Sequence, residues 1–173
     1  GMDCVAMNVN DLLCVGAEPL AFVDYIAVPT PSNDAHSRIG ESLSEACKRA
    51  NVTLAGGETA TLPGIVTELD LSGTALGWLP SGKAIAGSDI RPDDVLIGFP
   101  SSGIHSNGFS LVRKVVSKSG MSLTEPCPFS PEHESRSVEF DHGDLGSVLL
   151  NPTRIYVDPI VELLFSDMAI CKR

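Results

Sequence analysis

The alternation of strand-like and helix-like segments constrains the fold of this chain most strongly. The run Leu20–Val28 is rich in β-branched and aromatic residues and ends at two prolines, which predicts a strand. Ser32 or Asn33 then offers the N-cap of a helix that continues to about Ala50. The apolar stripe of that helix consists of Ile39, Leu43, Ala46 and Ala50. A strand that leads directly into an amphipathic helix predicts a mixed α/β (α+β) fold.

Further segments extend this pattern in both directions. Residues 2–15 place apolar side chains on one face, which predicts a helix ended by Gly16. A short strand at Val52–Ala55 leads into a glycine pair, and residues 65–79 alternate well enough for one or two further strands.

A change in composition divides the chain. The segment Ser81–Asp94 is rich in Gly, Pro and Asp, so we expect domains at 1–85 and 92–173, the second of them incomplete. In the second domain we expect a strand at 95–99, a helix around 111–116 and a long surface loop within 119–146. Asn151-Pro152 predicts the start of a final helix, which Pro159 would kink or divide.

The composition excludes several classes of function. Apolar residues make up 43% of the chain, enough for a core, and the formal net charge is −10. Nucleic acids and anionic membranes need a basic surface, so we expect neither as a partner. The sequence has no apolar run of ~18 residues and no basic leader, and we expect a soluble protein.

The cysteines favour a cytoplasmic location. The chain has 5 cysteines, an odd number without a CxxC pair, which favours reduced, mostly buried thiols over a disulfide or zinc framework. Because the sequence begins at Gly1 without methionine and stops in a helical pattern at Arg173, we expect a piece of a longer chain.

The most specific segment for function lies between the expected strand and helix of the second domain. Residues 101–110 read Ser-Ser-Gly-Ile-His-Ser-Asn-Gly-Phe-Ser. Backbone N–H groups, hydroxyls and a helix N-terminus meet there, and together they favour an anion. His105 could be structural and Asn107 only a helix cap; as a group, Ser102, His105, Ser106 and Asn107 predict a site for a phosphorylated small molecule.

Asn10 and Asp11 stand between apolar residues in the first helical pattern, where a carboxylate suits a Mg²⁺ ion that carries nucleotide phosphates. The simpler interpretation of their spacing is an exposed helical turn with a solvated aspartate.

The sequence Gly56-Gly57-Glu58-Thr59 offers close approach to a phosphate, a Mg²⁺ ligand and a hydroxyl donor. A plain glycine turn with a surface glutamate fits equally well. Asp70, between two leucines, is a candidate metal or nucleotide ligand or an outward-facing strand residue. The sequence shows no Ser-His-Asp order and no zinc-type spacing.

Together, five separated motifs closely resemble the aminoimidazole ribonucleotide synthetase family, the phosphoribosylformylglycinamidine cyclo-ligases of purine biosynthesis. The resemblance runs through nearly the whole chain. The motifs are residues 1–12, Gly16-Ala17-Glu18-Pro19-Leu20, Gly56-Gly57-Glu58-Thr59-Ala60, residues 100–114 and Pro152-Thr153-Arg154-Ile155-Tyr156-Val157.

The resemblance implies a two-domain ATP-dependent synthetase that closes the ring of formylglycinamidine ribonucleotide through a phosphorylated amide. It implies that Asp11 and Glu58 are metal–nucleotide ligands and that Gly56 and Gly57 line the phosphate path. From their own positions in the sequence, we add Asn10 and Thr59 as nucleotide-binding candidates and Asp70 as a metal candidate. The resemblance implies that His105, Ser106 and Asn107 face the substrate. We take His105 and Asn107 as the catalytic candidates and add Ser102 to the substrate residues. The resemblance also implies a homodimer whose N-terminal strands, here about 20–28 and 68–79, form a shared barrel.

The chain also departs from the family. The family's Asp-Gly-Val-Gly-Thr-Lys segment and its downstream Thr-Gly-Gly-Gly region do not occur here, and residues 125–146 match no family pattern. We therefore expect a fragment that is inactive alone. The alternatives are formylglycinamidine ribonucleotide synthetase, selenophosphate synthetase, thiamine monophosphate kinase, or a non-catalytic nucleotide-binding and dimerisation domain.

Overall fold

The computed structural model describes residues 1–128 and 143–165. It consists of two compact units, which are described separately. The first unit contains Gly1–Leu96 together with the residues from Ile155 onward, and the second contains Ile97–Arg154. The predicted domain ranges, 1–85 and 92–173, assign the residues after 155 to the second domain instead.

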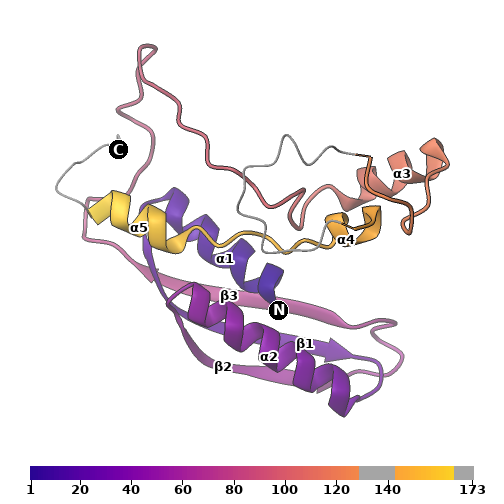
Figure 1. Ribbon diagram of the computed structural model, residues 1–173. Coiled ribbons are helices and arrows are strands. Elements are labelled where there is room, and N and C mark those ends of the chain that lie inside the picture. The colour runs from indigo at the N-terminus through magenta and orange to yellow at the C-terminus, as the bar shows by residue number, and fades with distance from the viewer. Residues whose placement is uncertain (129–142, 166–173) are drawn as a thin grey trace. The chain divides into compact units, whose positions relative to one another are not determined.

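The first unit is built on a three-stranded mixed sheet of order β2-β1-β3 (Figure 1). The central strand β1 runs parallel to β2 and antiparallel to β3. The predicted α/β class is therefore confirmed. The elements of this unit are α1 (Met2–Cys14), β1 (Glu18–Val28), α2 (Asn33–Arg49), β2 (Thr53–Thr61), β3 (Asp70–Trp78) and α5 (Val157–Phe165).

Local sequence signals account for α1 and α2. The helical conformation ends after α1 at Gly16, which has φ 79° and whose N–H donates to the carbonyl of Leu13. The hydroxyl of Ser32 accepts from the N–H of Ala35 at 3.4 Å and so caps α2. Both helices and the strand between them were predicted, and all three are confirmed.

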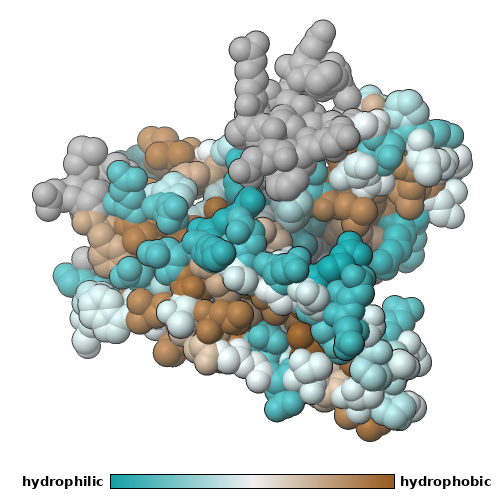
Figure 2. Space-filling model, turned by 60° about the horizontal axis from the view of Figure 1, so that its bottom comes forward, coloured by the Kyte–Doolittle hydropathy of each residue, from teal (hydrophilic) through white to brown (hydrophobic). Residues whose placement is uncertain are grey.

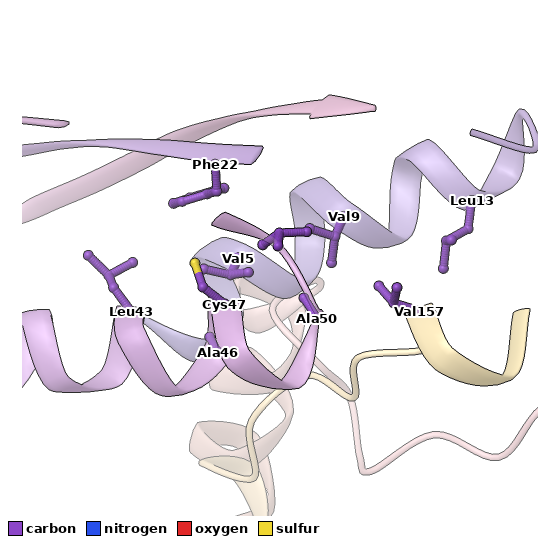
Figure 3. Close-up of a cluster of buried hydrophobic side chains, with 10 residues drawn as sticks. Val5, Val9, Leu13, Phe22, Leu43, Ala46, Cys47, Ala50 and Val157 are labelled. Atoms are coloured by element: carbon purple, nitrogen blue, oxygen red, sulfur yellow. The ribbon is translucent and has the colours of Figure 1, made fainter. Parts of the chain in front are cut away.

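The core lies between these two helices and one face of the sheet. Phe22 points from β1 toward Leu43 and Cys47 of α2, as Figure 3 shows. Gly73 of β3 leaves room for the Phe22 ring, because a Cβ at that position would clash with it. The other members of the cluster are Val5, Val9, Leu13, Ala46, Ala50, Val52 and Val157.

Two predicted strands differ from the structure. The strand predicted at 52–55 continues as β2 to Thr61, so the Gly-Gly-Glu-Thr sequence lies inside a strand and not in a turn. Residues 95–99, predicted as a strand, have no regular structure, and Leu96 is 97% exposed. An apolar run forms a strand only where a neighbour completes its hydrogen bonds, and the described residues pair no strand with it.

The final helix begins later than predicted. Residues 151–156 are not helical, and α5 begins at Val157. Pro159 therefore falls in the first turn of α5, where a missing N–H leaves no helical hydrogen bond unmade. It does not divide the helix over Val157–Phe165.

The second unit contains α3 (Phe109–Ser119) and the short α4 (Leu145–Leu149), which the sequence did not predict. The carboxylate of Asp144 caps α4 by accepting from the N–H of Ser147 at 2.7 Å. Residues 129–142, half of the predicted 119–146 loop, lie outside the described residues.

Several large apolar side chains are exposed on the surface. Figure 2 shows hydrophobic residues, in brown, between polar ones on the face that it draws, and the exposed apolar side chains include Trp78, Leu76 and Leu111. Within 1–128 and 143–165, no helix has the length and apolar character needed to cross a membrane.

The cysteines only partly follow their prediction. Cys4, Cys14, Cys47 and Cys127 are free thiols, as predicted, but only Cys47 is fully buried and Cys14 is exposed. Cys171 lies outside the described residues.

Candidate functional site

The two polar residues near the end of α1 have different surroundings. The Asn10 side-chain oxygen accepts from the backbone N–H of Tyr156 at 3.1 Å, so this residue holds the chain just before α5. Asp11, one position later, is exposed to solvent. The structure therefore gives Asn10 a structural contact, while Asp11 presents a carboxylate at the surface.

The Gly-Gly-Glu-Thr sequence forms the middle of β2, paired in parallel with β1. Gly57 lies opposite Asp24, and the Asp24 carboxylate occupies the space that a Cβ at Gly57 would need. Gly56 has φ 154°, a conformation that disfavours other residues. Glu58 is exposed, and its carboxylate accepts from the N–H of Thr59 at 3.1 Å.

The structure does not gather the predicted metal ligands into one cluster. Glu58 lies in β2, Asp70 begins β3, and β1 runs between them. β2 and β3 are therefore two strand spacings apart, roughly 10 Å. In the described part of the chain, no group of 3 or more His, Cys, Asp or Glu residues could hold a metal ion. The roles of Asp11, Glu58 and Asp70 remain predictions.

Asp24 is a half-buried carboxylate that the sequence analysis did not single out. Burial raises the pKa of the nearby Cys47 thiol, and the charge of Asp24 raises it further. Burial likewise raises the pKa of Cys4, to which Asp24 also contributes. Both thiols are therefore protonated at neutral pH, which disfavours a role as nucleophile.

In the second unit, the predicted substrate residues lie on a strongly bent loop. His105 has φ 57°, an uncommon conformation for a residue other than glycine, and Gly103 and Gly108 also have positive φ. The N–H of Ser102 donates to Nε2 of His105 at 3.2 Å. A ring nitrogen that accepts carries no proton, so a neutral His105 carries its proton on Nδ1.

This loop leads into the N-terminus of α3. The N-cap residue is Gly108, at φ 79°, whose carbonyl accepts from the N–H groups of Leu111 and Val112. Asn107 therefore does not occupy the cap position that the sequence allowed. A helix N-terminus beside hydroxyl and imidazole groups is an arrangement that favours an anion.

The segment 151–154 carries partners of this loop that sequence reasoning missed. The Ser102 hydroxyl donates to the carbonyl of Pro152 at 2.6 Å, and the hydroxyls of Ser106 and Thr153 lie 2.8 Å apart. Asn151 donates to the carbonyl of Ser102 at 3.4 Å, and Arg154 donates to that of Pro100 at 3.3 Å. The only sequence signal for these contacts is the Pro-Thr-Arg-Ile-Tyr string, which the resemblance included without a role.

A separate pocket lies in the first unit between α5, the start of β1 and the turn after α2. Its volume is about 240 Å³, and Glu18, Asp158 and Glu162 are among its lining residues. None of the predicted site residues lines it.

Two family models match successive parts of the chain. The family model for AIR synthase related protein, N-terminal domain, matches residues 1–79. The model for AIR synthase related protein, C-terminal domain, matches residues 91–170.

The chain is similar to curated phosphoribosylformylglycinamidine cyclo-ligases. It is 46% identical to that of Methanosarcina mazei over 158 residues, which cover 91% of this chain and 44% of the relative. It is 46% identical to that of Methanothermobacter thermautotrophicus over 170 residues, 98% of this chain and 47% of the relative. The chain therefore spans about half the length of these relatives.

Solved structures show the same fold at lower identity. The hydrogenase maturation protein HypE in complex with ATP matches with a TM-score of 0.54 and 22% identity, over 70% of this chain and 36% of HypE. Thiamine-monophosphate kinase from Stenotrophomonas maltophilia matches with a TM-score of 0.55 and 23% identity, over 94% of this chain and 46% of the kinase.

Proposed function

Because this chain belongs to the AIR synthase related proteins, with both of the family's domains represented, we propose that it is part of a phosphoribosylformylglycinamidine cyclo-ligase. The observation that carries the proposal is 46% identity to a curated cyclo-ligase over 98% of the chain. The proposed reaction is ATP-dependent closure of formylglycinamidine ribonucleotide to aminoimidazole ribonucleotide, in the cytoplasm.

In the proposed reaction, ATP phosphorylates the formyl amide oxygen of the substrate. A nitrogen of the same molecule then attacks the carbon that bears this phosphorylated oxygen. The imidazole ring closes and phosphate leaves. Positioning and charge neutralisation supply most of the rate in such phosphoryl chemistry. The loop 101–108 supports this proposal, since the Ser106 hydroxyl and the start of α3 suit a phosphorylated ligand, while the Ser102 hydroxyl, which donates to the Pro152 carbonyl, holds the loop.

The first unit supplies donors of the type that Mg²⁺ takes. Mg²⁺ binds through one or two carboxylates plus water and substrate phosphates, so a tight cluster of protein ligands is not required. The exposed carboxylates of Asp11 and Glu58 fit that donor set, and Gly56 of β2, with open space where a Cβ would stand, suits close approach of a nucleotide. When bound, the ion would neutralise phosphate charge.

We also propose the homodimer in which the strands of two copies form one barrel. Both β2 and β3 are edge strands of the sheet, and Val23, Tyr25, Leu76 and Trp78 expose apolar surface on its strands. Exposed edges and apolar faces favour association with another sheet.

The test is a substrate panel assayed with the full-length gene product. ATP consumption is measured with formylglycinamidine ribonucleotide, selenide and thiamine monophosphate in parallel. ATP consumption only with the first, together with aminoimidazole ribonucleotide as product, supports the proposal. ATP consumption only with thiamine monophosphate, with transfer of the phosphoryl group to it, supports a thiamine-monophosphate kinase, whose fold this chain shares. Binding of ATP without turnover of any substrate supports a non-catalytic domain.

A further inference from the structure

Two buried polar side chains connect segments of the second unit that lie far apart in the sequence. Asn151 is 8% exposed and Thr153 is 6% exposed, and they are the buried polar residues of the described chain. Burial of a polar group costs free energy unless it is hydrogen bonded. Both side chains bond to residues 102–106, across 47 to 49 positions of sequence.

The loop that they contact requires external support. His105 is held in the left-handed region at φ 57°, where a side chain other than glycine is strained. Such a conformation persists only where the surroundings hold it in place. Four hydrogen bonds join residues 100–106 to residues 151–154, and they supply that support.

The hydrogen bond of Thr153 differs from the other three because its partner is a side chain and not a backbone carbonyl. Asn151 and Arg154 donate to backbone carbonyls, and Ser102 donates to the backbone of Pro152. The Thr153 hydroxyl instead lies 2.8 Å from the hydroxyl of Ser106, a predicted substrate residue. It therefore sets the direction of a functional side chain in addition to the course of the backbone.

We propose that Thr153 is a positioning residue, which orients the Ser106 hydroxyl toward the phosphorylated substrate. This inference rests on the proposed function, from which the role of Ser106 comes. Thr153 itself is buried and acts through Ser106. The expected consequence is that its removal weakens substrate binding without changing the chemistry of the bound complex.

The test is a double-mutant cycle in the full-length gene product with Thr153→Val, Ser106→Ala and the double variant. Thr153→Val keeps the side-chain shape and removes the hydroxyl, so KM for formylglycinamidine ribonucleotide should rise about tenfold while kcat stays within about twofold. Thr153→Ser restores the hydroxyl and should restore KM. In the Ser106→Ala background, Thr153→Val should change KM by less than about twofold, because the group it orients is already absent.

A matched control uses a hydroxyl pair on the surface of the same unit. The Ser122 and Thr124 hydroxyls lie 2.9 Å apart but are exposed, so Thr124→Val should leave KM and kcat unchanged. Thermal unfolding of each variant separates loss of folding from loss of positioning.

The outcomes separate this inference from the proposed function. If the effects of Thr153→Val and Ser106→Ala on KM multiply, the positioning role is overturned while the function stands. If the protein turns over selenide or thiamine monophosphate instead, the proposed function fails, and the same cycle on that substrate decides the inference. Turnover of none of the three overturns both.

Discussion

The interactions inside the first unit differ in kind from those inside the second. In the first, two helices cover one face of the sheet, and Phe22, Leu43, Val5 and Val9 are fully buried between them. In the second, α3 buries no side chain, and hydrogen bonds link distant segments: side chains join residues 100–106 to 151–154, and backbone groups join 123–125 to 145–146. Apolar packing therefore orders the first unit, whereas polar contacts order the loop that we propose binds substrate.

Truncating the first unit's core should have the largest effect. Phe22→Ala removes a fully buried ring that contacts both helices, and should lower the free energy of unfolding by about 3–5 kcal/mol. Leu111→Ala, at a side chain of α3 that is 67% exposed, should change it by less than about 0.5 kcal/mol. Urea denaturation of the 173-residue chain, monitored by circular dichroism, measures both changes in the free energy of unfolding. Equal losses would contradict the comparison.

The proposed Mg²⁺ site on the surface of the first unit is tested by substitution of Asp11. Asp11→Asn in the full-length gene product should lower Mg²⁺-dependent ATP turnover at least about tenfold, because an amide is a much weaker Mg²⁺ ligand than a carboxylate. Asp34→Asn is the matched control, since Asp34 is also an exposed helical aspartate. Unchanged turnover in Asp11→Asn would remove this residue from the metal site.

The same division explains how far the sequence predicted the structure. The first helix, β1 and α2 follow from periodicity and from local signals such as the Ser32 cap, because short-range rules decide them. The length of β2 was missed, since Gly56 and Gly57 have low strand propensity and are held in the strand by pairing with Val23 and Asp24.

In the second unit, local signals misled. Asn151 was interpreted as a helix cap, but its side chain donates to Ser102, 49 positions away. His105 and Ser106 were identified as candidates from their own neighbourhood. Thr153 and Arg154 were not, because nothing local in a sequence predicts contacts across 47 to 54 positions.

The thiols provide a comparison inside the first unit. Burial raises the pKa of Cys47, so iodoacetamide should label exposed Cys14 at least about tenfold faster at pH 8, as read by mass spectrometry. A raised folded-state pKa stabilises the fold fully below the ordinary thiol value of 9.0, and that contribution is lost as pH rises through the raised value. Above pH 9, the free energy of unfolding should therefore fall less steeply in Cys47→Ala than in the parent chain.

The two helix caps offer the smallest and most direct test of the comparison. Ser32→Ala removes the cap of α2, whose helix packs into the core, and should cost about 1 kcal/mol of global stability in urea denaturation. Asp144→Ala removes a shorter hydrogen bond, 2.7 Å, from the 5-residue α4. Because Leu145 is the only buried apolar side chain among the described residues of its unit, we expect loss of the cap to raise amide hydrogen exchange around 145–149 without moving the global urea midpoint. A shift of that midpoint by Asp144→Ala as large as the shift by Ser32→Ala would show that the two units unfold together, and the contrast between them would not extend to their stability.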